Sequence, residues 1–211
     1  MKKPIPICSV ERLCAIYNLL EQWEEVGMQK VSSIELGKQL GINANSIRKD
    51  ISYLGEIGNC RAGYSLATLK ESLIQNLNIN RKRVVCLVGL GRLGSAILKY
   101  EQLSQNGFKI AAGFDTNINK IETIQTKVPL YPASEIALVV RRERIELGLL
   151  AVPGAAAVET AKRLIDGGIR GIVNFSAVVL RPEKGVFIRN IDLVSELRVI
   201  SVITGFLDQN S

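Results

Sequence analysis

The segment VVCLVGLGRLGSAILKY, residues 84–100, constrains the fold of this chain more than any other stretch. An apolar run typical of a strand leads into Gly89-x-Gly91-x-x-Gly94, and a helical pattern of apolar residues follows. In such a unit the first glycine allows a tight turn, the second lets the backbone approach a pyrophosphate, and the third lets the helix pack on the sheet. The segment predicts the phosphate-binding turn of a dinucleotide-binding domain; the alternative is a glycine turn that binds nothing.

Strand and helix patterns alternate after this turn. We expect strands at 84–88, 109–114, 128–131, 147–152, 171–175 and 186–191, with helices between the first five and a short loop before the sixth. This alternation predicts a parallel sheet with crossover helices, an α/β Rossmann-like doubly wound fold.

Asp115 follows the second strand, 21 residues after Gly94. A carboxylate at about this distance accepts hydrogen bonds from the ribose hydroxyls of adenosine. Its charge would repel a 2′-phosphate, and the neighbouring DTNIN contains no arginine. These features favour NAD(H) over its phosphorylated counterpart.

Two later strand ends are candidates for the nicotinamide pocket, because ligands of open α/β sheets bind beyond the carboxyl ends of the strands. LLAVPGAAA places Ala151, Val152 and Pro153 at the fourth strand end, and VNFSA places Asn174, Phe175 and Ser176 at the fifth. Ordinary loops between strand and helix are the alternative.

The chain lacks the residues expected of a dehydrogenase. Hydride transfer usually needs a positioned acid or base, most often histidine, and the sequence has no histidine. The Rossmann-like part contains no Tyr-x-x-x-Lys spacing and leaves no room for a substrate domain. Cofactor binding without catalysis is therefore the better hypothesis.

Composition bears on three other possibilities: a metal site, a membrane or secreted protein, and an anionic partner. The four cysteines (Cys8, Cys14, Cys60, Cys86) form no C-x-x-C pair, so packing roles are favoured over a metal site. No apolar run is long enough for a membrane span and the N-terminus does not resemble a signal peptide, so we expect a cytoplasmic protein. The net charge of +7 permits an anionic partner.

The N-terminal 83 residues have helical periodicity almost throughout. An amphipathic helix is expected at 9–26, and a short second helix should follow the capping-box pair Ser32 and Glu35. Asn43 can cap a third helix with Ile47, Ile51 and Leu54 facing inward. A glycine-rich stretch then precedes a fourth helix whose inward leucines are Leu66, Leu69, Leu73 and Leu77.

The third helix presents polar residues on its outer face. Arg48 could read guanine edges in a major groove, while Ser46, Lys49 and Tyr53 could reach phosphates, and Ser52 lies on the same face. With the preceding helix it forms a helix-turn-helix. A solvated basic face is the alternative, and the 12 basic against 8 acidic residues up to Arg83 support DNA binding without deciding it.

These segments together resemble the Rex family of redox-sensing transcriptional repressors. The resemblance rests on SSIELGKQLGINANSIRKDISYLGEIGNCRAGY, LVGLGRLGSAILKY, GFDTN, AVPGAAA, GIRGIVNFSAVVL and NIDLVSEL, in this order. It implies a homodimer with a winged-helix DNA-binding domain (1–83), an NAD(H)-binding Rossmann domain (84–192) and a C-terminal helix (193–211) exchanged between subunits. It further implies a repressor, and no enzyme, that holds operator DNA when NADH is scarce and leaves it when NADH binds.

The resemblance also implies roles for individual residues. Arg48 and Lys49 would lie on the recognition helix, and Arg61, Gly63 and Tyr64 in the wing. Tyr100 and Asp192 would lie near the dimer interface that senses the nicotinamide. The cofactor contacts would be Gly89, Leu90, Gly91, Arg92, Leu93, Gly94, Asp115, Ala151, Val152, Pro153, Asn174, Phe175 and Ser176.

Three segments depart from the pattern of the family. Relatives usually read SYFGEFG where this chain reads SYLGEIG, and their wing sequence RGVGY is CRAGY here. An arginine of the first helix is expected to pair with the partner's C-terminal segment, and this chain has Tyr17-Asn18 near that place. The wing and the coupling between subunits can therefore differ in detail.

The C-terminal segment favours a dimer on its own residues. Apolar residues stand at 193, 194, 197, 199, 200, 202, 203, 206 and 207, on almost all sides of a helix, and such a helix must be buried on most sides. Insertion between the domains of a partner would bury it; packing on its own sheet is the alternative.

Three hypotheses follow. The first is an NADH-responsive dimeric repressor. The second is a small NAD-dependent oxidoreductase with an N-terminal dimerisation bundle, and the third is a structural DNA-binding protein whose Rossmann part only dimerises.

Overall fold

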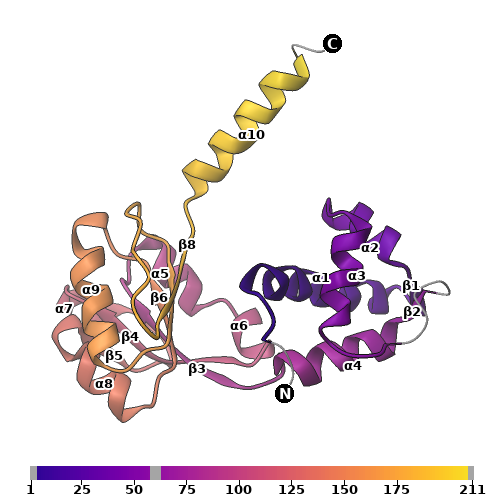
Figure 1. The fold of residues 1–211 in the computed structure, drawn as a ribbon. Coiled ribbons are helices and arrows are strands. Elements are labelled where there is room, and N and C mark those ends of the chain that lie inside the picture. Colours follow the sequence, from indigo (N-terminus) through magenta and orange to yellow (C-terminus); the bar gives the residue numbers. More distant parts are fainter. Residues whose placement is uncertain (1–3, 58–62, 209–211) are drawn as a thin grey trace. The chain divides into compact units, whose positions relative to one another are not determined.

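The computed structural model describes residues 4–57 and 63–208. The chain divides into two compact units, Met1–Arg81 and Lys82–Ser211, which run from indigo to magenta and from magenta to yellow in Figure 1. The boundary precedes the expected one after Arg83, because Arg83 already pairs with Phe108 in the first strand of the second unit.

The first unit is mainly helical. Its elements are α1 (Ile7–Glu25), β1 (Lys30–Val31), α2 (Ser33–Leu40), α3 (Ala44–Ser52), β2 (Tyr64–Ser65) and α4 (Leu66–Leu77). The two short strands pair antiparallel, with Val31 opposite Tyr64.

The helix starts follow the polar residues that precede them. The Ser32 hydroxyl accepts a hydrogen bond from the Glu35 N–H and the Glu35 carboxylate accepts one from the Ser32 N–H, which confirms the predicted capping box. Asn43 caps α3 as expected. α1 starts at Ile7, two residues early, directly after Pro6, because proline is tolerated where a helix N–H would be unpaired anyway.

The predicted apolar stripes form the core of the first unit. Ile47 and Ile51 of α3 and Leu69 and Leu73 of α4 are buried. Leu77, at the end of α4, is only half-buried. The helical interpretation of this part is thereby confirmed.

The second unit is built on a six-stranded sheet in the order β5-β4-β3-β6-β7-β8, and every pairing between its strands is parallel. The chain therefore starts in the middle at β3, builds outward to β5, and returns to build the other half from β6, which is the doubly wound Rossmann order. The strands are β3 (Arg83–Val88), β4 (Phe108–Asp115), β5 (Leu130–Pro132), β6 (Leu147–Leu150), β7 (Gly171–Asn174) and β8 (Phe187–Asn190).

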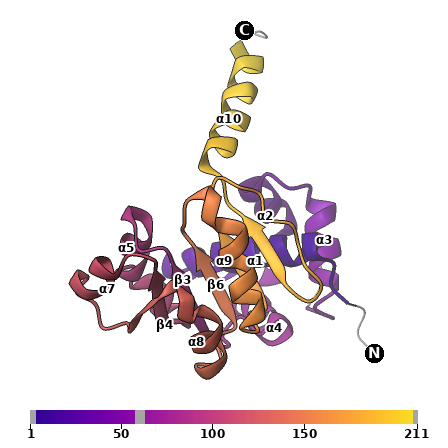
Figure 2. The same cartoon turned by 90° about the vertical axis from the view of Figure 1, so that its left-hand side faces the viewer.

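Helices connect the strands from β3 to β7, a loop joins β7 to β8 as expected, and α9 packs against β6 (Figure 2). The core beneath them contains Phe114, Ile136 and Leu164, all fully buried. The helices of this unit are α5 (Arg92–Leu98), α6 (Gln102–Gln105), α7 (Ile118–Thr123), α8 (Ile136–Arg142), preceded by the 3-10 turn Ala133–Glu135, α9 (Gly154–Asp166) and α10 (Leu193–Asp208).

Some expected strand bounds were wrong. The third strand runs Leu130–Pro132 instead of 128–131. The fourth ends at Leu150, two residues early, because the chain turns at Val152-Pro153 to start α9, and the residue before a proline is restricted.

α10 exposes its apolar side chains in the single chain. Leu193, Leu197, Ile200 and Phe206 are 72%, 61%, 58% and 59% exposed. This exposure contradicts the alternative in which the helix packs on its own sheet. Within residues 4–57 and 63–208, no helix has both the length and the apolar character to cross a membrane.

Candidate functional site

The glycine turn lies where the chain passes from β3 to α5, beside the point at which the sheet order reverses. Gly89 has a φ of +96°, which side chains rarely adopt, and a Cβ there would lie 2.3 Å from the Ala151 carbonyl oxygen. A Cβ on Gly94 would lie 1.8 Å from the Gly89 oxygen. A Cβ on Gly91 would meet nothing within 4 Å. Gly89 and Gly94 are thus required by the fold, whereas at Gly91 the backbone borders open space.

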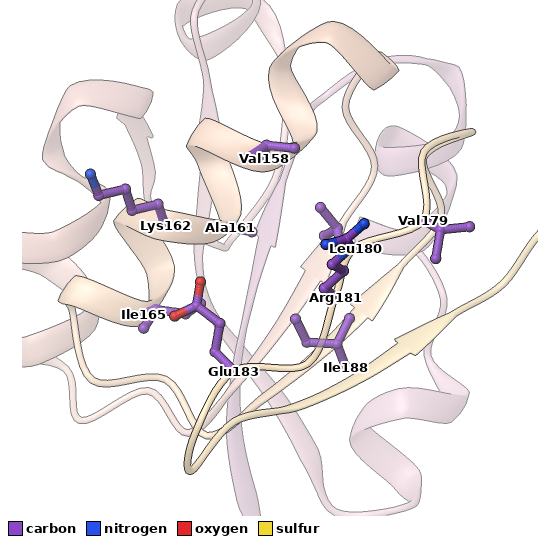
Figure 3. Close-up of a pocket in the computed structure, with 9 residues that line it drawn as sticks. All are labelled: Val158, Ala161, Lys162, Ile165, Val179, Leu180, Arg181, Glu183 and Ile188. Atoms are coloured by element: carbon purple, nitrogen blue, oxygen red, sulfur yellow. The ribbon is translucent and has the colours of Figure 1, made fainter.

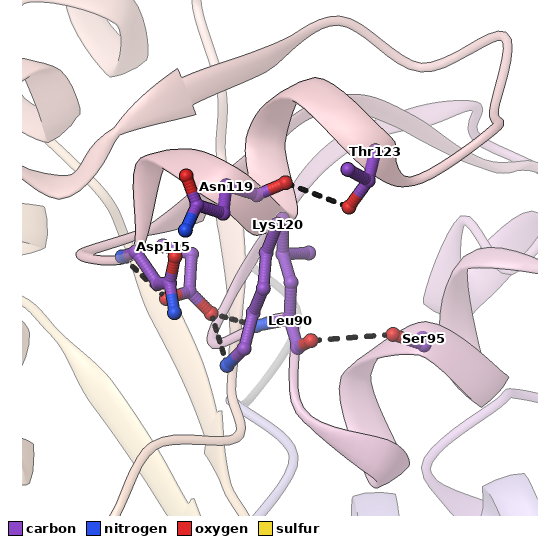
Figure 4. A network of polar contacts seen from close by, with 7 residues as sticks. Leu90, Ser95, Asp115, Asn119, Lys120 and Thr123 are labelled. Carbon is purple, nitrogen blue, oxygen red and sulfur yellow. Dashed lines mark hydrogen bonds and ion pairs between the residues drawn. The ribbon is translucent and has the colours of Figure 1, made fainter.

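The residues between these glycines differ in exposure. Leu90 is buried, while Arg92 and Leu93 are exposed in the first turn of α5. The Ser95 hydroxyl donates a hydrogen bond to the Leu90 carbonyl at 3.3 Å (Figure 4). The Ser95 hydrogen bond therefore ties the turn to α5, and the outer edge of the turn is exposed to solvent.

Asp115 ends β4 next to the glycine turn. Its Oδ2 accepts hydrogen bonds from the Leu90 N–H at 2.7 Å and from Lys120 Nζ at 3.2 Å, and its Oδ1 accepts one from the Asn117 N–H at 2.8 Å (Figure 4). Burial alone would raise the pKa of Asp115, but the hydrogen bonds from Asn117, Leu90 and Lys120 together lower it. The ionised carboxylate thus fixes the turn and keeps acceptor capacity on Oδ1.

Lys120 was missed in the sequence. No arginine follows Asp115 in DTNIN, and lysine was not considered in the prediction from the sequence. Lys120 lies in the first turn of α7, which starts three residues after Asp115 and brings the ammonium group back to the carboxylate. A basic residue five positions after the acidic residue was the available signal.

The loop after β6 lies against the glycine turn, as expected for neighbouring strand ends. The closeness of the Ala151 oxygen and of a Val152 methyl to Gly89 shows this directly. Pro153 follows, exposed, at the start of α9.

The loop after β7 is tied together by Asn174. Its amide donates to the Val178 carbonyl at 2.7 Å and to Asn190 Oδ1 at 2.8 Å, and its oxygen accepts from the N–H and the hydroxyl of Ser176 at 3.0 and 2.7 Å. Both side chains are buried. These bonds join the side chains of Asn174 and Ser176 within the loop. The expected contact of the two residues with a cofactor stays a prediction. Phe175 is half-buried, and its N–H pairs with Leu150.

The two residues expected near a sensing interface have separate partners in the single chain. The exposed Tyr100 donates its hydroxyl to the side chain of Gln102. Asp192 starts α10 by accepting hydrogen bonds from the Val194 N–H and the Ser195 hydroxyl, and chiefly the latter lowers its pKa.

A second candidate region is the outer face of α3. Arg48 is half-buried and donates hydrogen bonds to the Ser33 hydroxyl at 2.8 Å and to the side-chain oxygen of Asn45. Lys49 and Ser52 are exposed, and Ser46 and Tyr53 are half-buried. The expected polar face exists, and it includes Asn45, which the sequence interpretation overlooked.

The residues expected in the wing are Arg61, Gly63 and Tyr64, and the described ones, Gly63 and Tyr64, differ in their surroundings. Gly63 has a φ of +78° and lies beside the Val31 carbonyl. Tyr64 is 3% exposed and its ring packs in the core of the unit; the expected contact of this residue with DNA stays a prediction. Arg61 lies outside the described residues.

An ion pair ties α3 to α1. Arg12 Nε and Nη2 donate to the two oxygens of Asp50 at 2.5 and 2.8 Å, and Asp50 is fully buried. This carboxylate raises the pKa of Arg12. The sequence signal was an aspartate at position 50 on the inward stripe of α3.

A hollow of about 260 Å³ lies elsewhere in the second unit, between α9 and the segment that joins β7 to β8 (Figure 3). Ala161 and Ile165 of α9 face Leu180 and Ile188 across it. None of the predicted cofactor residues lines this hollow.

Family models match both parts of the chain. A model described as a CoA binding domain matches residues 80–178, and one described as the N-terminus of putative DNA-binding proteins matches residues 4–52. They support the division into a nucleotide-binding part and a DNA-binding part.

Curated proteins match nearly the whole chain. The redox-sensing transcriptional repressor Rex 1 of Enterococcus faecalis is 34% identical over 196 residues, 93% of this chain and 91% of that protein. The redox-sensing transcriptional repressor Rex of Lactobacillus gasseri is 36% identical over 93% of this chain and 92% of that protein. These relatives are repressors and not enzymes, which confirms the expectation of a regulator.

Solved structures agree. The crystal structure of RSP, a Rex-family repressor, has a TM-score of 0.87 at 26% identity and covers 99% of this chain and 98% of its own. RSP has also been solved with β-NADH and with β-NAD⁺ and operator DNA. Because it shares about a third of its sequence with such repressors over nearly its full length, this chain belongs to the Rex family of redox-sensing transcriptional repressors.

Proposed function

We propose that this chain binds operator DNA through its first unit when NADH is scarce and releases the DNA when NADH binds to its second unit. The observation that carries the proposal is the open backbone at Gly91 beside the ionised Asp115, at the reversal point of the sheet. A helix-turn-helix lies in the same chain. RSP, a relative of the same fold, has been solved with both ligands.

The dinucleotide would lie across the carboxyl ends of β3, β4 and β6. Its pyrophosphate would approach Gly91 and accept hydrogen bonds from the backbone N–H groups at the start of α5. Asp115 would accept a ribose hydroxyl on Oδ1, and Lys120 lies beside it as a further donor. Ala151 to Pro153 and the ring of Phe175 would border the nicotinamide. The chain supplies no histidine for acid–base chemistry, so bound NADH acts as a signal.

The active form would be a homodimer formed through α10. Its exposed apolar side chains need a partner, and a second copy of the chain presents the same exposed apolar side chains. Removal of residues 193–211 should then give a monomer in light scattering; a dimer that persists would contradict this assignment.

The release mechanism would be a population shift. NADH would bind better to a dimer arrangement in which the recognition helices no longer match two half-sites one helical turn apart. Tyr100 and Asp192 would lie near the interface that distinguishes the arrangements. By linkage, DNA must weaken NADH binding by the same factor. The protein would act in the cytoplasm.

The test is a mobility shift on a duplex that the protein itself selects from a randomised pool. We expect NADH to release this duplex at concentrations at which NAD⁺ does not. Turnover of NADH with a panel of carbonyl compounds would favour the oxidoreductase hypothesis instead, and the absence of any NADH binding would favour a structural DNA-binding protein.

A further inference from the structure

Arg48 is held in place before any DNA is present. One terminal nitrogen of its guanidinium donates to the Ser33 hydroxyl at 2.8 Å, and the other donates to the side-chain oxygen of Asn45. The two acceptors lie on different helices, α2 and α3. Bonds from both ends of a planar group fix its plane as well as its position.

We propose that Ser33 and Asn45 are positioning residues that aim the Arg48 guanidinium at one guanine of the operator and thereby set base specificity at that position. The inference deepens the proposed function and rests on DNA binding by the first unit. A guanidinium has further N–H groups beyond the two that these bonds use, and two of them can bind the O6 and N7 acceptors of guanine together.

The two acceptors are themselves well supported. Ser33 is 5% exposed and is the first residue of α2, whose start is fixed by the capping box of Ser32 and Glu35. Asn45 lies in the first turn of α3, three positions before Arg48, so the two side chains share one face of the helix. The N-terminal residues of a recognition helix are those that meet base edges.

Holding the side chain in advance reduces the freedom that Arg48 loses when DNA binds. A held group also discriminates better, because it cannot swing away from a wrong base to find another acceptor. Lys49, the next residue, is exposed; a free ammonium of this kind fits a phosphate and carries no sequence information.

The rival explanation is that Asn45 reads a base itself. A randomised duplex pool separates the two, because it reports base preference at every position of the selected sites. The full-length protein and its Arg48→Ala, Asn45→Ala and Ser33→Ala variants would each select from the same pool. Affinities for the wild-type consensus duplex and for a scrambled duplex would be measured by fluorescence anisotropy at one salt concentration.

We expect Arg48→Ala to lose the preference for guanine at one position of each half-site. Asn45→Ala and Ser33→Ala should weaken the preference at that same position and at no other. Each should weaken consensus binding by at least about threefold, as contacting residues usually couple, with scrambled-duplex binding unchanged. Combined with Arg48→Ala, neither should have a further effect, because both act through Arg48.

Matched variants control for side effects. Asn80→Ala changes an exposed asparagine in the turn after α4 and should leave selection unchanged. Asn45→Asp keeps the acceptor and should keep the guanine preference while lowering affinity for all DNA. Lys49→Ala should weaken binding to all duplexes alike.

The proposal is overturned if Asn45→Ala changes preference at a different position, or if its effect adds to that of Arg48→Ala. It is also overturned if Ser33→Ala and Asn45→Ala select the same sites as the wild type while Arg48→Ala does not. In that case the proposed DNA binding still stands, and only the positioning role fails. If the wild-type protein selects no sequence at all, the proposed function fails first.

Discussion

Replacing Gly91 by alanine separates ligand binding from folding at the glycine turn. The residue has a φ of −74° and open space where a Cβ would lie, so the folded backbone accepts a side chain there. Alanine is a poorer N-cap than glycine by up to about 1 kcal/mol. It also restricts the unfolded chain, which returns about 0.4–1 kcal/mol. The two effects oppose each other, so we expect the free energy of unfolding to change by less than about 1 kcal/mol.

Binding of NADH should respond strongly to the same change. The new methyl would stand between the backbone and the pyrophosphate and lengthen its hydrogen bonds to the start of α5. Loss of one hydrogen bond to a charged group costs about 1.5–3 kcal/mol. This corresponds to a Kd for NADH that is roughly 10- to 100-fold higher. Isothermal titration with NADH gives the Kd, and urea unfolding followed by circular dichroism gives the stability.

Gly94→Ala is the companion variant, and we expect it to lower the free energy of unfolding, which Gly91→Ala should leave nearly unchanged. Its Cβ would lie 1.8 Å from the Gly89 carbonyl oxygen, a backbone atom that cannot rotate away, so α5 must shift from the sheet. Overpacking of this kind costs about 1–3 kcal/mol of stability. An unchanged NADH affinity of stable Gly91→Ala would refute the assignment of this turn to the pyrophosphate.

Three further predictions concern stability. Arg12→Ala should lower the urea midpoint of the first unit, because it leaves the buried Asp50 carboxylate without its cation. The double variant Arg12→Met with Asp50→Leu should restore most of this midpoint. The fluorescence of Trp23, the single tryptophan, reports the unfolding of this unit. Ser32→Ala should lower the free energy of unfolding by about 1 kcal/mol in the same assay, because the N-cap of α2 is lost. An unchanged midpoint would show that the Ser32 cap does not stabilise the unit. The pKa of folded Asp115 is lowered, so the stabilising effect of its charge is complete above the unfolded pKa of about 3.9 and is lost as the pH falls through the lower folded value. Asp115→Asn should accordingly lose less stability than the wild type in urea titrations between about pH 5 and pH 3, and equal losses would contradict the pKa shift.

Local patterns were sufficient for most of the fold. The capping pair Ser32 and Glu35 and the stripe of Ile47 and Ile51 act within one or two turns of helix, so spacing alone identifies them. The glycine turn was equally readable, because its spacing reflects backbone clearances at Gly89 and Gly94.

The parts that sequence spacing did not reveal depend on tertiary proximity. Arg12 and Asp50 are 38 residues apart, and Arg48 and Ser33 are 15 apart on different helices. The hydrogen bonds between Asn174 and Ser176, which hold the loop after β7 together, also could not be read from the sequence. Each required the packed structure, because a polar side chain in a sequence does not show which partner it finds.

The central claim is that NADH, and not NAD⁺, releases this protein from DNA. The most direct measurement titrates both cofactors into the complex with its selected duplex at constant salt, with release followed by fluorescence anisotropy. The account predicts release by NADH at concentrations where NAD⁺ leaves the complex intact. Equal release by the two cofactors, or by neither, would contradict it.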